Sequence, residues 1–84
     1  MEYRYQVASD VKRNGLGVEL TTADGNVVAE VFRCDANNSL TVTLYDEAVP
    51  FAYIEKLVGM ARENLGEFED GTELPVLSPS GWAK

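Results

Sequence analysis

The residues of this 84-residue chain that could carry chemistry are its carboxylates and a single thiol. Asp46 and Glu47 are adjacent, so on a strand their side chains would point to opposite faces and could not hold one ion or share one proton. Near the start of a helix the same negative charge would be favourable, because it faces unpaired backbone N–H groups. We therefore interpret the pair as the entry to a helix that begins at Pro50.

A denser group of acids follows that predicted helix. Its order, EFEDGTE, lacks the alternating carboxylates of a calcium-binding loop. We expect either a solvated loop or an electrostatic contact with a basic partner. The residues concerned are Glu67, Glu69, Asp70 and Glu73.

Catalytic chemistry is disfavoured by the residue types of the chain. Histidine is absent, which removes the commonest general base and the commonest neutral metal ligand, and no Cys–His or Ser–His pair can be built. Cys34 lies in a predicted polar turn and is interpreted as a bystander thiol. The glycines of RNGLGVEL lie in a predicted hairpin with no helix after them, so they do not form a phosphate-binding loop. We predict a protein that is not an enzyme, with no cofactor, no metal site and no small-molecule substrate.

Composition and charge bear on partner and location. The chain is 45% hydrophobic and 25% charged, as in ordinary globular domains, and its net charge of −7 disfavours nucleic acid as a partner. No apolar run approaches the roughly 18 residues that span a membrane. The N-terminus lacks the pattern of a secretory signal, and Cys34 has no partner for a disulfide within the chain. We expect a cytoplasmic protein with no membrane contact.

The elements that must position these residues follow from the spacing of apolar side chains. Alternation predicts four strands, at residues 3–12, 16–21, 27–33 and 40–45. Turns are expected at Asn14-Gly15, at Asp24-Gly25 and in the stretch CDANNS. Strands joined by such short turns form an antiparallel meander.

The register of the meander depends on the turn at Asp24-Gly25. A two-residue loop there brings Glu19 beside Glu30, a like-charge pair that costs a few tenths of a kcal/mol. A three-residue bulged turn would separate that pair but turn Glu30 inward beside Val18, so we prefer the two-residue loop. In this register Val18 lies opposite Val31, Leu20 opposite Ala29, Val31 near Val42 and Ala29 near Leu44, which makes one apolar face.

A helix is predicted from Pro50 to Gly66, since proline suits the first turn and glycine the end. Its apolar stripe, widened by Leu57, contains Phe51, Ile54, Val58, Ala61 and Leu65. The predicted fold is therefore α+β: a four-stranded antiparallel meander in the order β-β-β-β-α, with one C-terminal helix packed on one sheet face in two layers. Residues 1–66 would form one domain, and residues 67–84 an acidic tail containing glycine and proline that is partly ordered at most.

One helix covers only one face of a sheet, so the other face needs a shield. That second face is too apolar to be left in water, and exposed apolar patches mark interfaces. Either the C-terminal residues or a second copy of the chain would cover it. We take the contact residues to be Val28, Phe32, Thr41 and Tyr45, together with Trp82.

The element order, which ends in SLTVTLYDEAVPFAYIEKLVGMAREN, resembles that of PUR-type and other single-strand-binding coactivator modules. The resemblance implies bases stacked on Phe32 and Tyr45, with a basic patch from Arg4, Lys12, Arg13 and Arg33. Our leading hypothesis is a non-enzymatic interaction protein that uses the uncovered face for self-association or for a protein partner, including a basic one. The alternatives are a single-stranded nucleic-acid-binding module and an enzyme with carboxylate or thiol chemistry.

Overall fold

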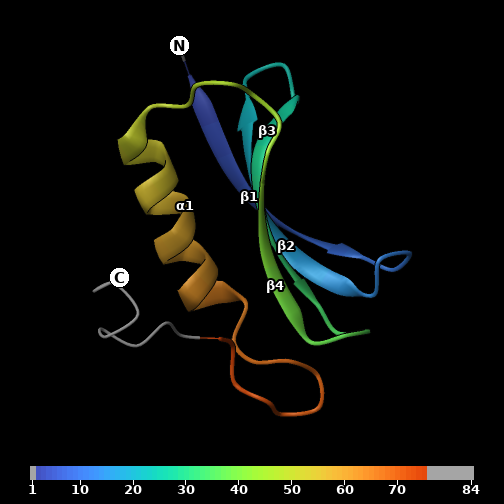
Figure 1. The fold of residues 1–84 in the computed structure, drawn as a ribbon. Helices are drawn as coiled ribbons and strands as arrows, with labels where there is room; N and C mark the ends of the chain where they lie inside the picture. Colours follow the sequence, from blue (N-terminus) through green and yellow to red (C-terminus); the bar gives the residue numbers. More distant parts are fainter. Residues whose placement is uncertain (1, 76–84) are drawn as a thin grey trace.

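The fold is a four-stranded antiparallel sheet with one helix packed on it, seen in a computed structural model that describes residues 2–75 (Figure 1). The strands lie side by side in their order along the chain, so the predicted α+β meander is confirmed. The elements are β1 (Tyr3–Asp10), β2 (Gly15–Thr22), β3 (Val27–Cys34), β4 (Ser39–Leu44) and α1 (Phe51–Asn64).

The predicted cross-strand pairs are confirmed, but the turn that joins β2 to β3 differs from the prediction. Residues 23–25 form a three-residue loop in which Gly25 has φ 91°, and the Thr22 amide donates to the Asn26 carbonyl at 2.9 Å. A β-bulge at Val28 then accommodates the extra residue of the loop. Leu20 pairs with Ala29, whereas the next residue of β2 pairs with Val27, so Val28 has no partner on β2. The bulge restores the register in which Glu30 stays on the face opposite the core, so the objection to a three-residue turn does not apply.

The turn between β1 and β2 also lies earlier than predicted. It consists of residues 11–14, and only Asn14, at φ 54°, has the left-handed conformation expected of a hairpin turn. Gly15 is the first residue of β2 and pairs with Asp10. A side chain there has no room, since a Cβ would overlap the Arg33 carbonyl oxygen of β3 and lie 2.5 Å from Cζ of Phe32.

The helix has the predicted ends and a rotated apolar face. Pro50 precedes its first residue, and Gly66, at φ 62°, follows its last turn. Phe51 and Val58, predicted to face the core, are 75% and 44% exposed, while Leu57 is fully buried. The rotation follows from an attachment to β1 at the first turn, where the Tyr5 hydroxyl donates to the Tyr53 carbonyl at 3.0 Å and the Tyr3 and Tyr53 rings lie 4.6 Å apart.

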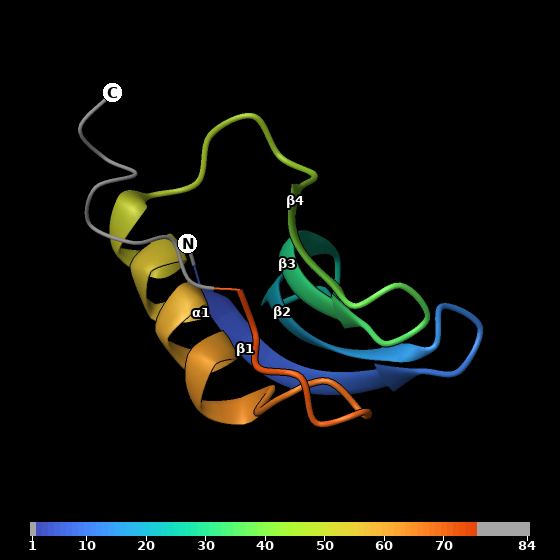
Figure 2. The ribbon, with the colours of Figure 1, turned by 60° about the horizontal axis from the view of Figure 1, so that its bottom comes forward.

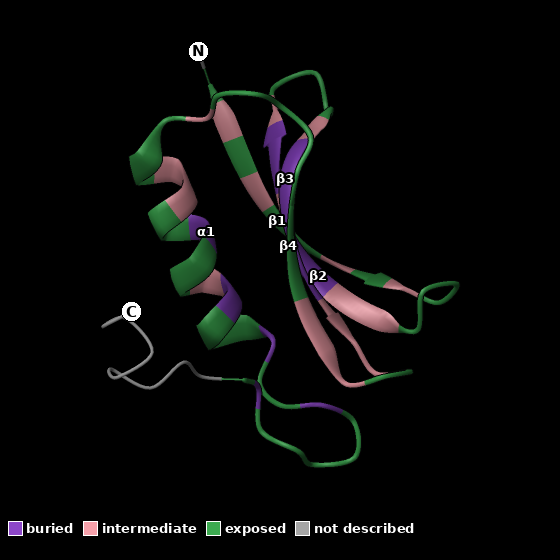
Figure 3. Cartoon of the chain, viewed as in Figure 1, coloured by how far each residue is buried: buried purple, intermediate pink, exposed green. Residues whose placement is uncertain are grey.

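The core lies between α1 and the sheet, and the segment after the helix closes one end of it (Figure 3). Residues 67–75, expected as part of a partly ordered tail, return beneath the helix and bury Phe68 and Leu74. The core residues are Val18, Leu20, Val28, Ala29, Val31, Leu57, Ala61, Leu65, Phe68 and Leu74. The packed unit therefore extends past Gly66.

Candidate interaction surface

Phe32, the central residue of the predicted contact face, is buried by the chain's own first turn. Its side chain is 6% exposed, and the Arg13 guanidinium lies over the ring at 3.9 Å from the centroid. Gly15 and Gly17 of β2 provide the space on the neighbouring strand, because a Cβ at either would press on the ring. The sheet curves so that the β1–β2 turn stands close to this face (Figure 2). Neither the C-terminal residues nor a second chain is needed to shield Phe32.

The same arginine neutralises a buried carboxylate. Arg13 donates from both terminal nitrogens to Glu30, at 2.9 and 2.8 Å, and from Nε to Asp10 at 2.6 Å. These hydrogen bonds, those to Glu30 above all, raise the pKa of Arg13 above its ordinary value. The predicted Glu19–Glu30 juxtaposition is confirmed, and Gln6 relieves it by donating to Glu19 at 2.6 Å. The face opposite the core thus carries its own charge compensation.

The residues predicted for the contact do not form one exposed patch. The bulge takes Val28 into the core cluster, so this residue does not join Phe32 on the outer face. Thr41 and Tyr45, on and just after β4, are exposed. Trp82 lies outside the described residues.

The apolar surface left open lies at β4, on the same face as the helix. Because α1 packs on β2 and β3, Val42 and Leu44 stay 54% and 59% exposed, and Val42 shares the lining of a groove with Val58 of the helix. This groove, of about 140 Å³, runs between the helix and this strand. Its lining is Val31, Leu40, Val42, Val58, Ala61, Arg62 and Leu74.

The backbone of β4 is open along the same edge. Among residues 2–75 only β3 pairs with this strand, and the Tyr45 amide donates to the Val28 carbonyl at 2.9 Å. Hydrogen-bonded pairs alternate along an antiparallel ladder, so the backbone groups of Thr41 and Thr43 also face β3. The N–H and C=O groups that point to the open edge therefore belong to Leu40, Val42 and Leu44, and the side chains of the first two line the groove.

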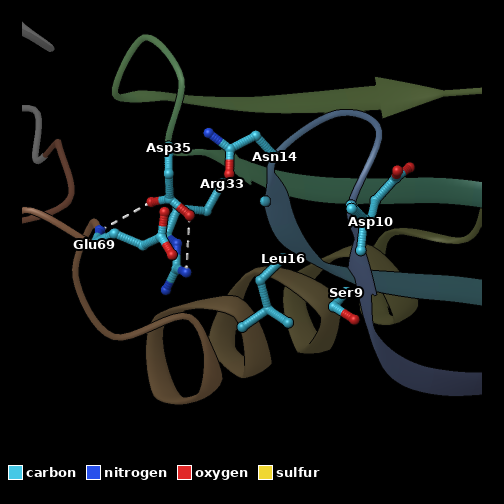
Figure 4. Close-up of a pocket in the computed structure, with 9 residues that line it drawn as sticks. Ser9, Asp10, Asn14, Leu16, Arg33, Asp35 and Glu69 are labelled. Carbon is cyan, nitrogen blue, oxygen red and sulfur yellow. Dashed lines mark hydrogen bonds and ion pairs between the residues drawn. The ribbon is translucent and has the colours of Figure 1, made fainter.

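A second hollow, of about 290 Å³, lies at the other end of the sheet (Figure 4). Asp35 stands between Arg33 and Glu69 there, accepting from Arg33 Nη2 at 3.1 Å and from the Glu69 amide at 3.0 Å. Arg33 also donates to the Leu65 and Glu67 carbonyls, so it attaches the segment after the helix to the sheet. These contacts pair the terminal nitrogens of Arg33 and the Asp35 carboxylate, while Arg33 Nε is buried without a hydrogen-bond partner among the described residues. We interpret the hollow as structural.

The carboxylates and the thiol singled out in the sequence are placed as follows. Asp46 and Glu47 are exposed in the segment before the helix, and neither caps it. Asp70 accepts from Asn38 at 2.9 Å, and hydrogen bonds, led by that from the backbone amide of residue 72, hold the pKa of Asp70 below its ordinary value. Cys34 donates to a backbone carbonyl in the first turn. The other acids, Glu67, Glu69 and Glu73, are exposed.

Sequence reasoning missed the two features that decide this surface. One is Arg13, which was interpreted as part of a basic patch. Its signal was a glycine, Gly17, directly opposite Phe32 in the predicted register, which leaves room beside the ring. The other is the open edge at Val42 and Leu44, whose signal was a last strand without a charged residue.

Residues 2–75 contain no metal-binding cluster and no helix that could span a membrane. No three histidine, cysteine, aspartate or glutamate side chains gather there closely enough to hold a metal ion. No helix in this part of the chain has the length and apolar character needed to cross a membrane.

Comparison of the chain with protein-family models, with curated proteins and with solved structures finds no match.

Proposed function

We propose that this chain is a non-enzymatic interaction protein that binds an extended segment of polypeptide along the open edge of β4. The segment would come from another protein or from a second copy, and its side chains would enter the groove beside α1. The observation that carries the proposal is an uncharged edge strand whose outward backbone groups adjoin the exposed Val42 and Leu44.

Edge strands are templates for pairing, and proteins that must avoid it protect them with charges, proline or bulges. β4 has none of these along Ser39–Leu44. The opposite edge, β1, carries Arg4 and Asp10. Strand addition joins backbone hydrogen bonds, which supply affinity, to pockets for alternate side chains, which supply specificity. β4 offers both on one side, because Leu40 and Val42, two of the residues with outward N–H groups, also line the groove.

The contact surface proposed here is thus the β4 edge, and Thr41 and Tyr45 remain part of it because they are exposed along that strand. No observation favours single-stranded nucleic acid, since Phe32 is covered and Arg13 and Arg33 are both held in ion pairs. A cytoplasmic location remains part of the proposal and rests on the lone Cys34. The contact between the acids of residues 67–73 and a basic partner stays a prediction.

The proposal can be tested by photo-crosslinking in cells that produce the full chain. The photoreactive residue p-benzoylphenylalanine would replace Leu44 in one variant and Val7 in the control. Val7 is a matched position, because it is also an exposed apolar residue on an edge strand, at 44% exposure against 59%. Adducts are separated by mass and the crosslinked polypeptide is identified by mass spectrometry.

We expect adducts with a second polypeptide from the Leu44 position and none from Val7. The identity of the adduct then separates self-association from a different partner. No adduct from either position, or equal adducts from both, would show that the β4 edge has no special role in binding.

A further inference from the structure

We infer that the segment on the β4 edge is β4 of a second copy, paired antiparallel about a two-fold axis through Val42. The inference rests on the proposed function of that edge and specifies its occupant. It joins two four-stranded sheets into one continuous sheet, with both copies of α1 on the same face.

The register follows from which backbone groups are available. The outward groups belong to Leu40, Val42 and Leu44, so a second copy can form hydrogen-bonded pairs only among these positions. The ladder with β3 continues to Tyr45, which makes residues 39–45 the extended stretch and Val42 its centre. A two-fold axis there pairs Val42 with Val42 and Leu40 with Leu44, and it uses the whole strand.

In this register the two copies are complementary on both faces. Apolar side chains meet apolar ones on the helix side, where Val42 and Leu44 are 54% and 59% exposed. Thr41 meets Thr43 on the outer face, a pairing that stabilises antiparallel strands. No charged residue lies anywhere along the paired stretch.

The placement of charge also fits a second copy. Each chain carries a net charge of −7, so two copies repel at long range. Continuing the register past the strand sets Asp46 opposite Asn38 and Glu47 opposite Asn37, so the acidic pair of one copy meets neutral amides of the other. The contact itself is neutral and only the surroundings repel, so added salt should strengthen the dimer rather than weaken it.

Sedimentation equilibrium on the full chain tests the inference directly. Between about 1 µM and 1 mM, the range of a weak small interface, we expect a shift from monomer to dimer mass. Raising the salt from about 20 to 500 mM should lower the dissociation constant several-fold, because the Debye length shrinks to a few ångströms. Val42→Lys should remain monomeric throughout, whereas Val7→Lys should dimerise like the wild type. A wild-type chain that stays monomeric at 1 mM overturns the inference.

The register has its own test, which does not depend on the lysine variant folding. Val42→Cys in a Cys34→Ser background places two thiols across the axis, at a Cα separation near 5.5 Å that a disulfide can span. Oxidised glutathione should convert this variant to a covalent dimer, and the matched Val7→Cys variant in the same background should stay monomeric. Equal crosslinking of both variants, or of neither, contradicts the register.

Failure of the inference can be told apart from failure of the proposed function. A monomeric chain whose Leu44 photo-adducts contain a different protein would overturn the dimer and leave the function of the edge in place. A monomeric chain without adducts at Leu44 would overturn both.

Discussion

Replacing Arg13 by methionine should strongly destabilise the protein, although Arg13 lies at its surface. The substitution removes both hydrogen bonds to Glu30 and the guanidinium that covers Phe32. It leaves a carboxylate that is 4% exposed without a partner, while the methionine preserves most of the apolar stem.

The magnitude follows from the burial of the two partners. Removing one member of a buried ion pair costs about 3–5 kcal/mol, because the remaining charge is left without compensation. The Arg13 side chain is 46% exposed, so water can partly replace it and the lower part of the range applies, about 2–3 kcal/mol. Loss of the cation–π contact with Phe32 adds about 0.5–1 kcal/mol. The total of about 3 kcal/mol corresponds to a fall in Tm of about 12–24 °C for a domain of this size.

The assay is thermal and urea unfolding of a double-mutant cycle with Arg13→Met, Glu30→Met and the combination of both. Glu30→Met should cost less than Arg13→Met, because the freed guanidinium keeps Asp10 and reaches water. The double variant should be more stable than Arg13→Met alone, since it contains no unpaired buried charge. Arg13→Lys should lie between Arg13→Met and the wild type, as lysine keeps the charge but not the two-pronged contact.

The reasoning is refuted if Arg13→Met lowers the Tm by less than about 4 °C, or if adding Glu30→Met brings no recovery. The first result would mean that solvent already compensates Glu30. The second would mean that the loss comes from packing on Phe32 and not from the carboxylate.

Two further predictions concern substitutions of two glycines and the loss of stability at acid pH. Gly59→Ala should raise the free energy of unfolding, measured in urea, by about 0.5–1 kcal/mol, because a Cβ at this mid-helix position meets nothing within 4 Å. A destabilised Gly59→Ala variant would reveal a contact at that helix face. Gly15→Ala should instead lower the free energy of unfolding, because its Cβ would clash with the Phe32 ring. Hydrogen bonds, from Arg13 to Asp10 and from the amide two residues on to Asp70, hold the pKa of each carboxyl below its ordinary value. The stability that these hydrogen bonds supply is complete above the carboxyl pKa of the unfolded chain, near 3.9. It is lost as the pH falls through the lower pKa values of the folded protein. Thermal unfolding between pH 5 and pH 2 should therefore show a shallower acid loss in the Asp10→Asn/Asp70→Asn double variant, and an unchanged slope would contradict this linkage.

The strand order and the cross-strand pairs could be predicted because they depend on alternation, which is a local property. Along β4 every second residue is apolar, namely Leu40, Val42 and Leu44. A shift of the strand register by one residue would turn this whole set to the opposite face of the sheet. The turn at Gly25 could not be predicted, because a three-residue loop followed by a bulge gives the same pairs beyond Leu20 as a two-residue loop. The residues of the turn do not distinguish the two.

The candidate site was predicted in part. Phe32 lies opposite the core as alternation required, yet its burial depends on Arg13, which comes from the β1–β2 turn and lies over the ring. Val58 has the helical spacing of a core residue, yet the helix is rotated toward β1 by the tyrosine contacts and leaves it 44% exposed. Both errors concern how elements are placed, not which elements form.

The sequence by itself determined which residues form strands and helix, and on which side of a strand each side chain points, because both depend on neighbours a few positions away. Only the tertiary structure decided which side chains are covered, because exposure is set by groups distant in the chain. The shield over Phe32 comes from the β1–β2 turn, and the opening at Val42 and Leu44 comes from the lean of α1 over the other strands. The exposed apolar surface therefore lies at the edge of β4 and not on the face opposite the helix.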